Sequence, residues 1–112
     1  MISTIFDVND IQSEYFVLKY SASWCGPCKI IKEYFESLSK DELFSNIQFY
    51  ETDINDINDS LLELGVIKYL PTFLFGIKDL ETNNINIKSN VIGINKEEIK
   101  NNLINLNEYI QT

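Results

Sequence analysis

A Cys-X-X-Cys pair follows an apolar run, and this joined stretch decides how the rest of the chain is interpreted. Residues 16–20 are apolar except for Lys19, and they lead into Ser21-Ala22-Ser23-Trp24-Cys25-Gly26-Pro27-Cys28-Lys29. Such a run predicts a strand buried in a sheet that is covered on both faces. Pro27 suits the first turn of a helix, where its missing N–H costs nothing. The stretch therefore predicts a strand that passes through the cysteine pair into a helix.

The start of a helix favours a reactive thiol at Cys25. Unsatisfied N–H groups and the positive end of the helix dipole both lower the pKa of a thiol placed there. A thiolate attacks disulfides, and Cys28, one turn later, can attack the mixed disulfide that results. The chain has no other cysteine, and a loop this short stabilises a fold only slightly. Reactivity therefore explains the pair better than stability does.

Strands and helices alternate along the rest of the chain. Further strands are predicted at residues 2–7, 47–53, 70–75 and 85–91, the last two joined by a hairpin through residues 82–84. Helices are predicted at residues 9–15, 58–64 and 96–109, and from Gly26 onward, where Ile30, Ile31, Tyr34, Phe35 and Leu38 form an apolar stripe. Alternation predicts a parallel sheet, to which the hairpin adds antiparallel strands. The expected fold class is α/β, with a central mixed five-stranded sheet flanked by helices on both faces, in one domain over residues 1–112.

Charge and composition exclude some partners. The formal net charge is −8, with nine lysines and no arginine against seventeen acidic residues. Repulsion argues against nucleic acid and against an anionic membrane as partners. The same charge favours a soluble monomer. No apolar run approaches the roughly 18 residues of a membrane span, and the first residues do not resemble a signal peptide. A cytoplasmic, reducing location is therefore expected.

The motif resembles a known family. Residues 24–29 resemble the thioredoxin active site residue for residue, and residues 21–24 resemble the approach to it in animal-type thioredoxins. The segment Leu70-Pro71-Thr72-Phe73 resembles the family segment that carries a cis-proline, and Gly93 matches the family's substrate-surface glycine. A bare Cys-X-X-Cys is a weak signal, but these features in the right element order are specific. The resemblance covers nearly the whole chain and implies the thioredoxin fold.

The resemblance assigns roles to these residues. Cys25 would be the exposed nucleophile and Cys28 the buried resolving thiol. Pro71 would lie against them with a cis peptide bond after Leu70, which would leave Leu70 backbone groups free for an extended substrate. A flat and mostly apolar docking face would consist of Trp24, Gly26, Pro27, Leu70, Ile92 and Gly93.

The implied activity is reduction of protein disulfides. Electrons would come from NADPH through a separate thioredoxin reductase, so the chain would need no bound cofactor. One alternative is a more oxidising disulfide oxidase or isomerase, and another is a non-catalytic thioredoxin-fold subunit of a partner. A zinc site needs four ligands. With no histidine and no third cysteine, only a metal or cluster shared between two chains stays open, and we expect none.

Lys19 departs from the family. Its position, six residues before Cys25, normally holds a buried aspartate that is thought to help move a proton at the resolving thiol. A buried lysine must pair, deprotonate or reach solvent. Glu51 interrupts another apolar strand, so we hypothesise a charge-swapped pair of Lys19 and Glu51, with Lys29 as a further candidate for tuning the thiols. A nearby cation should raise the reduction potential above thioredoxin's roughly −270 mV.

Overall fold

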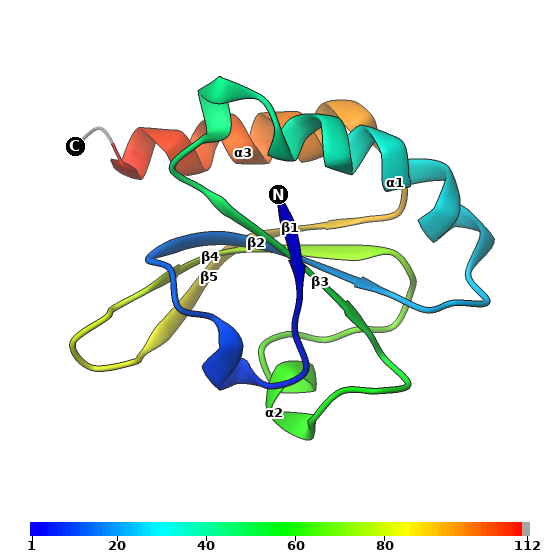
Figure 1. Ribbon diagram of the computed structural model, residues 1–112, viewed down its shortest axis with the longest axis horizontal. Coiled ribbons are helices and arrows are strands. Elements are labelled where there is room, and N and C mark those ends of the chain that lie inside the picture. The colour runs from blue at the N-terminus through cyan, green and yellow to red at the C-terminus, as the bar shows by residue number, and fades with distance from the viewer. Residues whose placement is uncertain (111–112) are drawn as a thin grey trace.

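The computed structural model describes residues 1–110, and its strands form one mixed sheet in the order β1-β3-β2-β4-β5 (Figure 1). The strands are β1 (Ile2–Thr4), β2 (Tyr15–Ser21), β3 (Gln48–Asp53), β4 (Thr72–Lys78) and β5 (Ile85–Ile92). β3 runs parallel to both β1 and β2, whereas β4 is antiparallel to β2 and to β5. The predicted mixed five-stranded sheet is confirmed.

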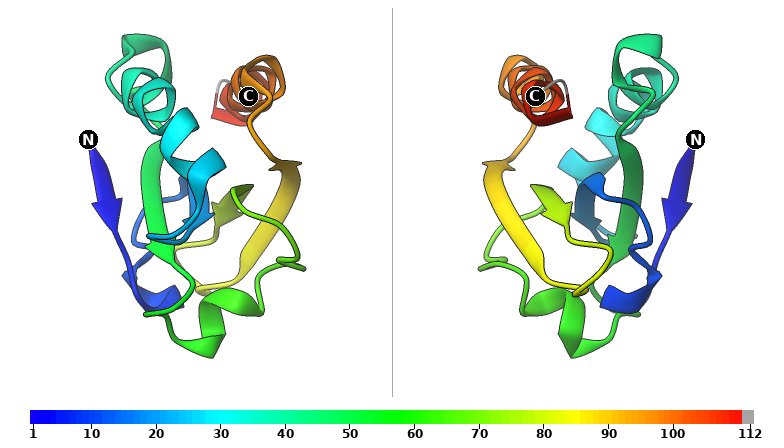
Figure 2. Two further views of the ribbon diagram at one scale, coloured as in Figure 1. Left: turned by 90° about the vertical axis from the view of Figure 1, so that its right-hand side faces the viewer. Right: turned by 90° about the vertical axis from the view of Figure 1, so that its left-hand side faces the viewer.

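Helices cover both faces of the sheet. Figures 1 and 2 show α1 (Gly26–Ser39) and α3 (Lys96–Ile110) on one face, and α2 (Asp59–Leu62) with the short 3-10 helix η1 (Val8–Asp10) on the other. A second 3-10 helix, η2 (Glu42–Phe44), joins α1 to β3. None of the helices in residues 1–110 is long and apolar enough to cross a membrane.

Each face of the sheet has its own apolar core. The first core lies under α1 and α3, and includes Val17, Ile31, Phe35, Phe49, Phe73, Phe75, Ile99, Leu103 and Leu106. The second core lies on the α2 side, and includes Ile11, Phe16, Leu18, Tyr20, Tyr50, Leu61 and Leu74. Because side chains alternate along a strand, β2 sends Val17 into the first core and its neighbours into the second. The same alternation directs Lys19 to the side of α1.

Several boundaries differ from those predicted. The first strand ends at Thr4, and the helix predicted at residues 9–15 is only the single turn η1. Asp7 caps that turn: its carboxylate accepts from the Asn9 N–H at 2.8 Å. The Asp10 carboxylate accepts in turn from the N–H groups of Phe6 and Asp7. Ile11 then adopts an extended backbone, which ends the helix, and its side chain lies fully buried in the second core.

The predictions for two helices and one strand also need correction. Asn58 caps α2, and this helix ends at Leu62 instead of the predicted residue 64. The fourth strand begins at Thr72, so Leu70 and Pro71 precede it. In α1, Ile30 does not belong to the buried stripe, because it lies 66% exposed while Ile31 is fully buried.

Candidate active site

The cysteine pair lies at the N-terminus of α1, as the sequence predicts. Cys25 is the N-cap residue, and Cys28 lies in the first turn with a Cα–Cα distance of 5.3 Å across their disulfide. The Cys28 N–H donates to the Cys25 sulfur at 3.2 Å. In the dithiol form, a donor in this position stabilises a thiolate at Cys25.

The chain is held in place on both sides of the motif. The Cys25 N–H donates to the Ala22 carbonyl at 3.0 Å. The Ser23 N–H donates to the Asp53 carboxylate at 3.1 Å, which ties the loop to the end of β3. The strand β2, which leads into the motif, and the strand β3 end at the same edge of the sheet because they are parallel.

The segment before β4 reaches the cysteines from far along the sequence. The peptide bond between Leu70 and Pro71 is cis, as predicted. Leu70 packs against a small cluster formed by Ala22, Cys25 and Cys28. The Gly93 N–H donates to the Pro71 carbonyl at 2.8 Å, and Gly93 has a φ of 91°, a value that favours glycine. The fold thus joins Leu70, Pro71 and Gly93 beside the disulfide.

One expectation about the nucleophile is wrong for this disulfide form. Cys25 was expected to be exposed, but it is 4% exposed, against 3% for Cys28. The reason is packing: Ile54 and Leu70 both cover the cluster that contains the two sulfurs. In the disulfide form, Cys25 therefore lies within a surface depression.

That depression is a groove of about 400 Å³, here called the docking groove. It is lined by Trp24, Cys25, Gly26, Pro27, Ile54, Ile67, Lys68, Tyr69 and Leu70. Trp24 is 67% exposed and Tyr69 66% exposed, so aromatic surface flanks the Cys25 side of the disulfide. Four of the predicted docking residues, Trp24, Gly26, Pro27 and Leu70, lie here together.

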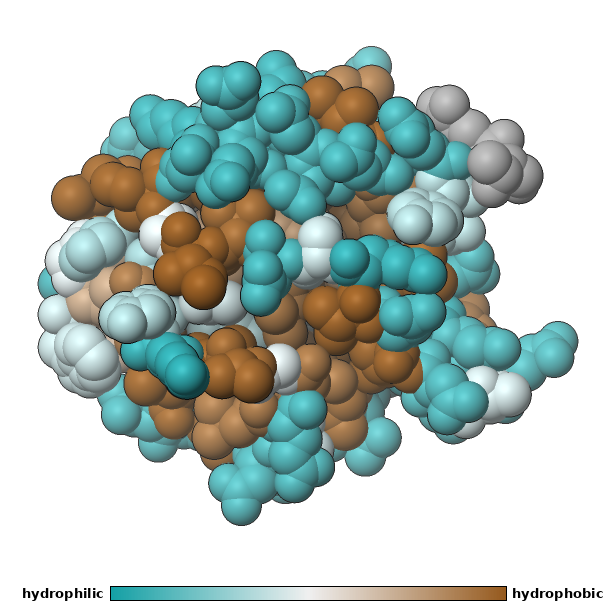
Figure 3. Space-filling view, turned by 180° about the vertical axis from the view of Figure 1, so that it is seen from behind, coloured by the Kyte–Doolittle hydropathy of each residue, from teal (hydrophilic) through white to brown (hydrophobic). Residues whose placement is uncertain are grey.

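Ile92 and Gly93, the other predicted docking residues, lie outside the groove lining. Ile92 is 52% exposed at the end of β5, and it pairs with Thr72 directly after the cis-proline. On the face opposite to the one seen in Figure 1, hydrophobic side chains are also exposed between polar ones (Figure 3). Ile92 and Gly93 therefore lie next to the cis-proline segment but outside the groove.

The sequence prediction missed Ile54, Ile67, Lys68 and Tyr69. Ile54 directly follows β3, whose carboxyl end lies beside that of β2. The other three precede Leu70, and their nearness in sequence to the cis-proline was the available signal.

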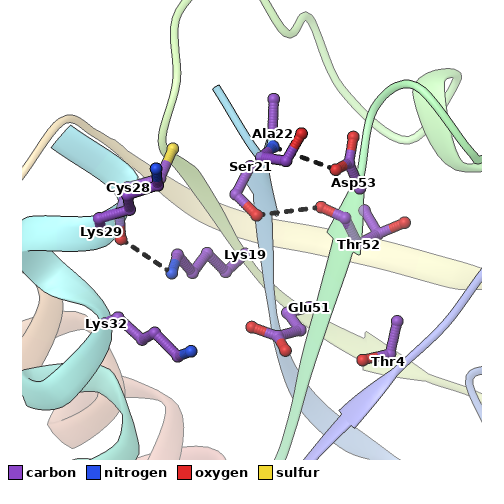
Figure 4. Close-up of a pocket in the computed structure, with 11 residues that line it drawn as sticks. Thr4, Lys19, Ser21, Ala22, Cys28, Lys29, Lys32, Glu51, Thr52 and Asp53 are labelled. Carbon is purple, nitrogen blue, oxygen red and sulfur yellow. Dashed lines mark hydrogen bonds between the residues drawn. The ribbon is translucent and has the colours of Figure 1, made fainter. Parts of the chain in front are cut away.

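Behind Cys28 lies a second depression of about 370 Å³, here called the rear pocket. Its lining includes Cys28, Lys29 and Lys32 of α1, Lys19 of β2 and Glu51 of β3. Figure 4 shows Lys19 extending from its strand toward the start of α1, while Lys32 and Glu51 reach toward the same space. Lys29 is exposed at the edge of this pocket.

Lys19 is bound to the active-site turn and is not paired directly with an acid. It is only 3% exposed, and its ammonium donates to the Cys28 carbonyl at 3.2 Å and lies 5.9 Å from the centre of the Phe35 ring. Lys19 and Glu51 are register partners in the parallel ladder. Within residues 1–110, however, no ion pair joins them at 4 Å or less.

The hypothesis of a direct Lys19–Glu51 ion pair is therefore wrong in its geometry. The carbonyl at the helix start takes the ammonium instead. Burial lowers the pKa of Lys19, the neighbouring Glu51 carboxylate opposes that shift, and Lys32 adds to it. The two charges are still coupled, but across the rear pocket and without contact.

The arrangement can perform dithiol–disulfide exchange. One sulfur lies at a helix start beside a groove that an extended chain can enter, and the other lies one turn deeper against a separate pocket. In residues 1–110, no group of three or more His, Cys, Asp or Glu side chains is placed to hold a metal ion.

Comparison with known proteins gives consistent matches. The sequence model of the Thioredoxin family matches residues 4–105. Thioredoxin from Equus caballus is 39% identical over 93 residues, which are 83% of this chain and 80% of that protein. Human thioredoxin is 42% identical over 84 residues, which are 75% of this chain and 71% of the human protein. The structure of Malassezia sympodialis thioredoxin superposes with a TM-score of 0.78 at 22% identity, covering 93% of this chain and 91% of that one, which shows the shared fold.

Proposed function

The chain belongs to the thioredoxin family and is a thiol–disulfide oxidoreductase that reduces protein disulfides; on that premise, we propose how its residues divide the work. Cys25 is the nucleophile, Cys28 the resolving thiol, and Pro71 the residue that holds the substrate-binding segment against them. The observation that carries this assignment is the position of Cys25. It caps α1, its sulfur accepts a hydrogen bond from the Cys28 N–H, and it lines the docking groove.

The proposed reaction proceeds in two exchanges. The Cys25 thiolate attacks one sulfur of the client disulfide, and the other client sulfur leaves and is protonated. Cys28 then loses its proton and attacks the Cys25 sulfur, which releases the second client thiol. Two electrons pass from the protein to the client, and the protein ends as the Cys25–Cys28 disulfide.

Each side of the disulfide serves one of these exchanges. The docking groove admits the client to Cys25, with Trp24, Gly26, Pro27 and Leu70 as contacts and with Ile92 and Gly93 beyond them. The rear pocket borders Cys28, and it offers that thiol a route for its proton. Lys19, Lys29 and Glu51 line the same pocket, where their charges tune the sulfurs.

The electron source and setting are also part of the proposal. NADPH supplies electrons through a separate thioredoxin reductase, and no bound cofactor is needed because the protein's own disulfide carries them. We place the protein in the cytoplasm as a single-domain monomer in an electron-transport chain for redox homeostasis. The net charge of −8 supports the monomer, and a reducing compartment matches a pair that acts as a dithiol.

Reduction of insulin disulfides by dithiothreitol tests this assignment. The wild type should accelerate the reaction, and Cys25→Ser should abolish the acceleration. A Cys28→Ser variant should instead accumulate a mixed disulfide with the client, which a non-reducing gel detects. Absence of acceleration by the wild type would overturn the assignment, as would full activity of Cys25→Ser.

A more oxidising role is the second candidate, because Lys19 brings a positive charge to the active-site turn. A reduction potential near −180 to −120 mV is typical of disulfide isomerases and oxidases. A measured potential in that range would favour this candidate over the reductase. Full biological function of a double Cys25→Ser, Cys28→Ser variant would instead favour a non-catalytic subunit.

A further inference from the structure

Lys68 gives the docking groove a charge that its other walls lack. Among the described residues lining this groove, Lys68 alone is charged, and the rest are apolar, aromatic, glycine or the cysteine itself. It lies two residues before Leu70, on the segment that packs against the cysteine cluster. A charged group of a bound client chain would therefore meet this ammonium close to the reacting sulfur.

The ammonium of Lys68 is free to bind such a group. The side chain is exposed, and within residues 1–110 it forms no hydrogen bond or ion pair. Asp53, at the nearby end of β3, lines the rear pocket instead. Its carboxylate already accepts from the N–H groups of Ser23 and Asn55.

The setting makes this single charge effective. The chain carries a net charge of −8, so most of its surface repels acidic clients and only local positive sites can offset that repulsion. Trp24, Tyr69 and Leu70 surround the groove with surface of low polarity. Clefts with such walls concentrate the field of one charge sign and raise the local concentration of oppositely charged substrate.

From these observations we infer that Lys68 makes the protein selective for disulfides flanked by acidic residues. The occupant of the groove is an extended client segment in which an Asp or Glu lies within about two residues of the cysteine that Cys25 attacks. This inference rests on the proposed function, because it concerns the client of the same exchange. The electrons still pass from the two protein thiols to the client disulfide, so Lys68 affects recognition and not the chemistry.

Three short peptides test the inference directly. Each has one internal disulfide, and they differ only in the residues beside the cysteines, which are Glu, Gln or Lys. The protein is reduced with dithiothreitol, freed of reagent and mixed with each peptide. Acid quenching and chromatography then give the second-order rate of peptide reduction.

The wild type should reduce the Glu peptide roughly two- to five-fold faster than the Gln peptide at low salt, as expected for an exposed charge pair. The Lys peptide should be the slowest, and the differences should shrink at high salt because ions screen the pair. Lys68→Gln should lower the ratio of the Glu-peptide rate to the Gln-peptide rate nearly to the value set by the protein's net negative charge alone. Lys68→Glu should lower this ratio further. Lys100→Glu is the matched control, since Lys100 is exposed on α3 outside the groove and the change in net charge is the same.

The outcomes separate this inference from the proposed function. If all three peptides are reduced but the wild-type ratio is one or less, the inference is overturned while the function stands. A ratio that Lys68→Glu and Lys100→Glu lower equally also overturns it, because net charge alone would then explain the preference. If none of the peptides is reduced, the proposed function fails, and the client preference fails with it.

Discussion

Replacing Lys19 by methionine should make the reduction potential of the Cys25–Cys28 couple more negative. The Lys19 ammonium is bound to the carbonyl of Cys28 at 3.2 Å and is almost fully shielded from solvent. A cation in this position stabilises thiolate, which belongs to the reduced state of the protein. Removing it destabilises the reduced state and so favours the disulfide.

The size of the shift follows from the position of the charge. The ammonium binds the backbone carbonyl of Cys28 itself, and a charge beside a titrating group shifts the pKa of that group by roughly one unit or more. One unit corresponds to about 1.4 kcal/mol, which is about 30 mV for a two-electron couple. We therefore expect Lys19→Met to shift the potential by about −30 mV. We expect Lys19→Asp, which reverses the charge, to shift it by about −60 mV.

Equilibration with glutathione buffers of known ratio measures this potential, with the oxidised fraction read after alkylation of free thiols. Glu51→Gln should shift the potential in the opposite direction, because this carboxylate opposes the charge of Lys19 across the rear pocket. Lys100→Met, outside both pockets, should leave it unchanged. An unchanged or less negative potential in folded Lys19→Met or Lys19→Asp would refute the electrostatic argument.

The second core gives further predictions, at Gly76 and Tyr20. A Cβ added at Gly76 would lie 2.5 Å from Cζ of the buried Phe16 ring, so Gly76→Ala should lower the unfolding free energy by about 1–3 kcal/mol in urea titrations. Gly26→Ala is its control, since nothing lies within 4 Å of the added Cβ, and equal losses would contradict the packing argument. The Tyr20 hydroxyl donates to the buried Leu61 carbonyl, so Tyr20→Phe should cost about 1–3 kcal/mol at neutral pH; no loss would show that this bond does not stabilise the fold. Burial raises the pKa of Tyr20, so above pH about 10 the unfolded state loses a proton that the folded state keeps. The unfolding free energy of the wild type should therefore fall as pH rises past that value, and more steeply than in Tyr20→Phe; identical slopes would show that Tyr20 does not titrate differently in the two states.

Local sequence determined the elements and the reactive pair. Apolar runs predicted the inner strands, and the position of Pro27 predicted the start of α1 beside Cys25. The family resemblance supplied the cis bond before Pro71, which the structure confirms. These features are readable because each depends on a few adjacent residues, or on a motif whose residues match the family.

Only the tertiary structure decided what lies around the sulfurs. The near-complete burial of Cys25 depends on Ile54 and Leu70, which arrive from separate segments. The contact of Lys19 with the Cys28 carbonyl depends on the pleat of β2 directing this side chain toward α1. Nothing in the sequence distinguishes Lys68 from the other lysines, because its position in the docking groove depends on how the cis-proline segment folds. The physical reason is the same in each case: burial and electrostatic coupling depend on distances through space, and residues far apart in the sequence set those distances.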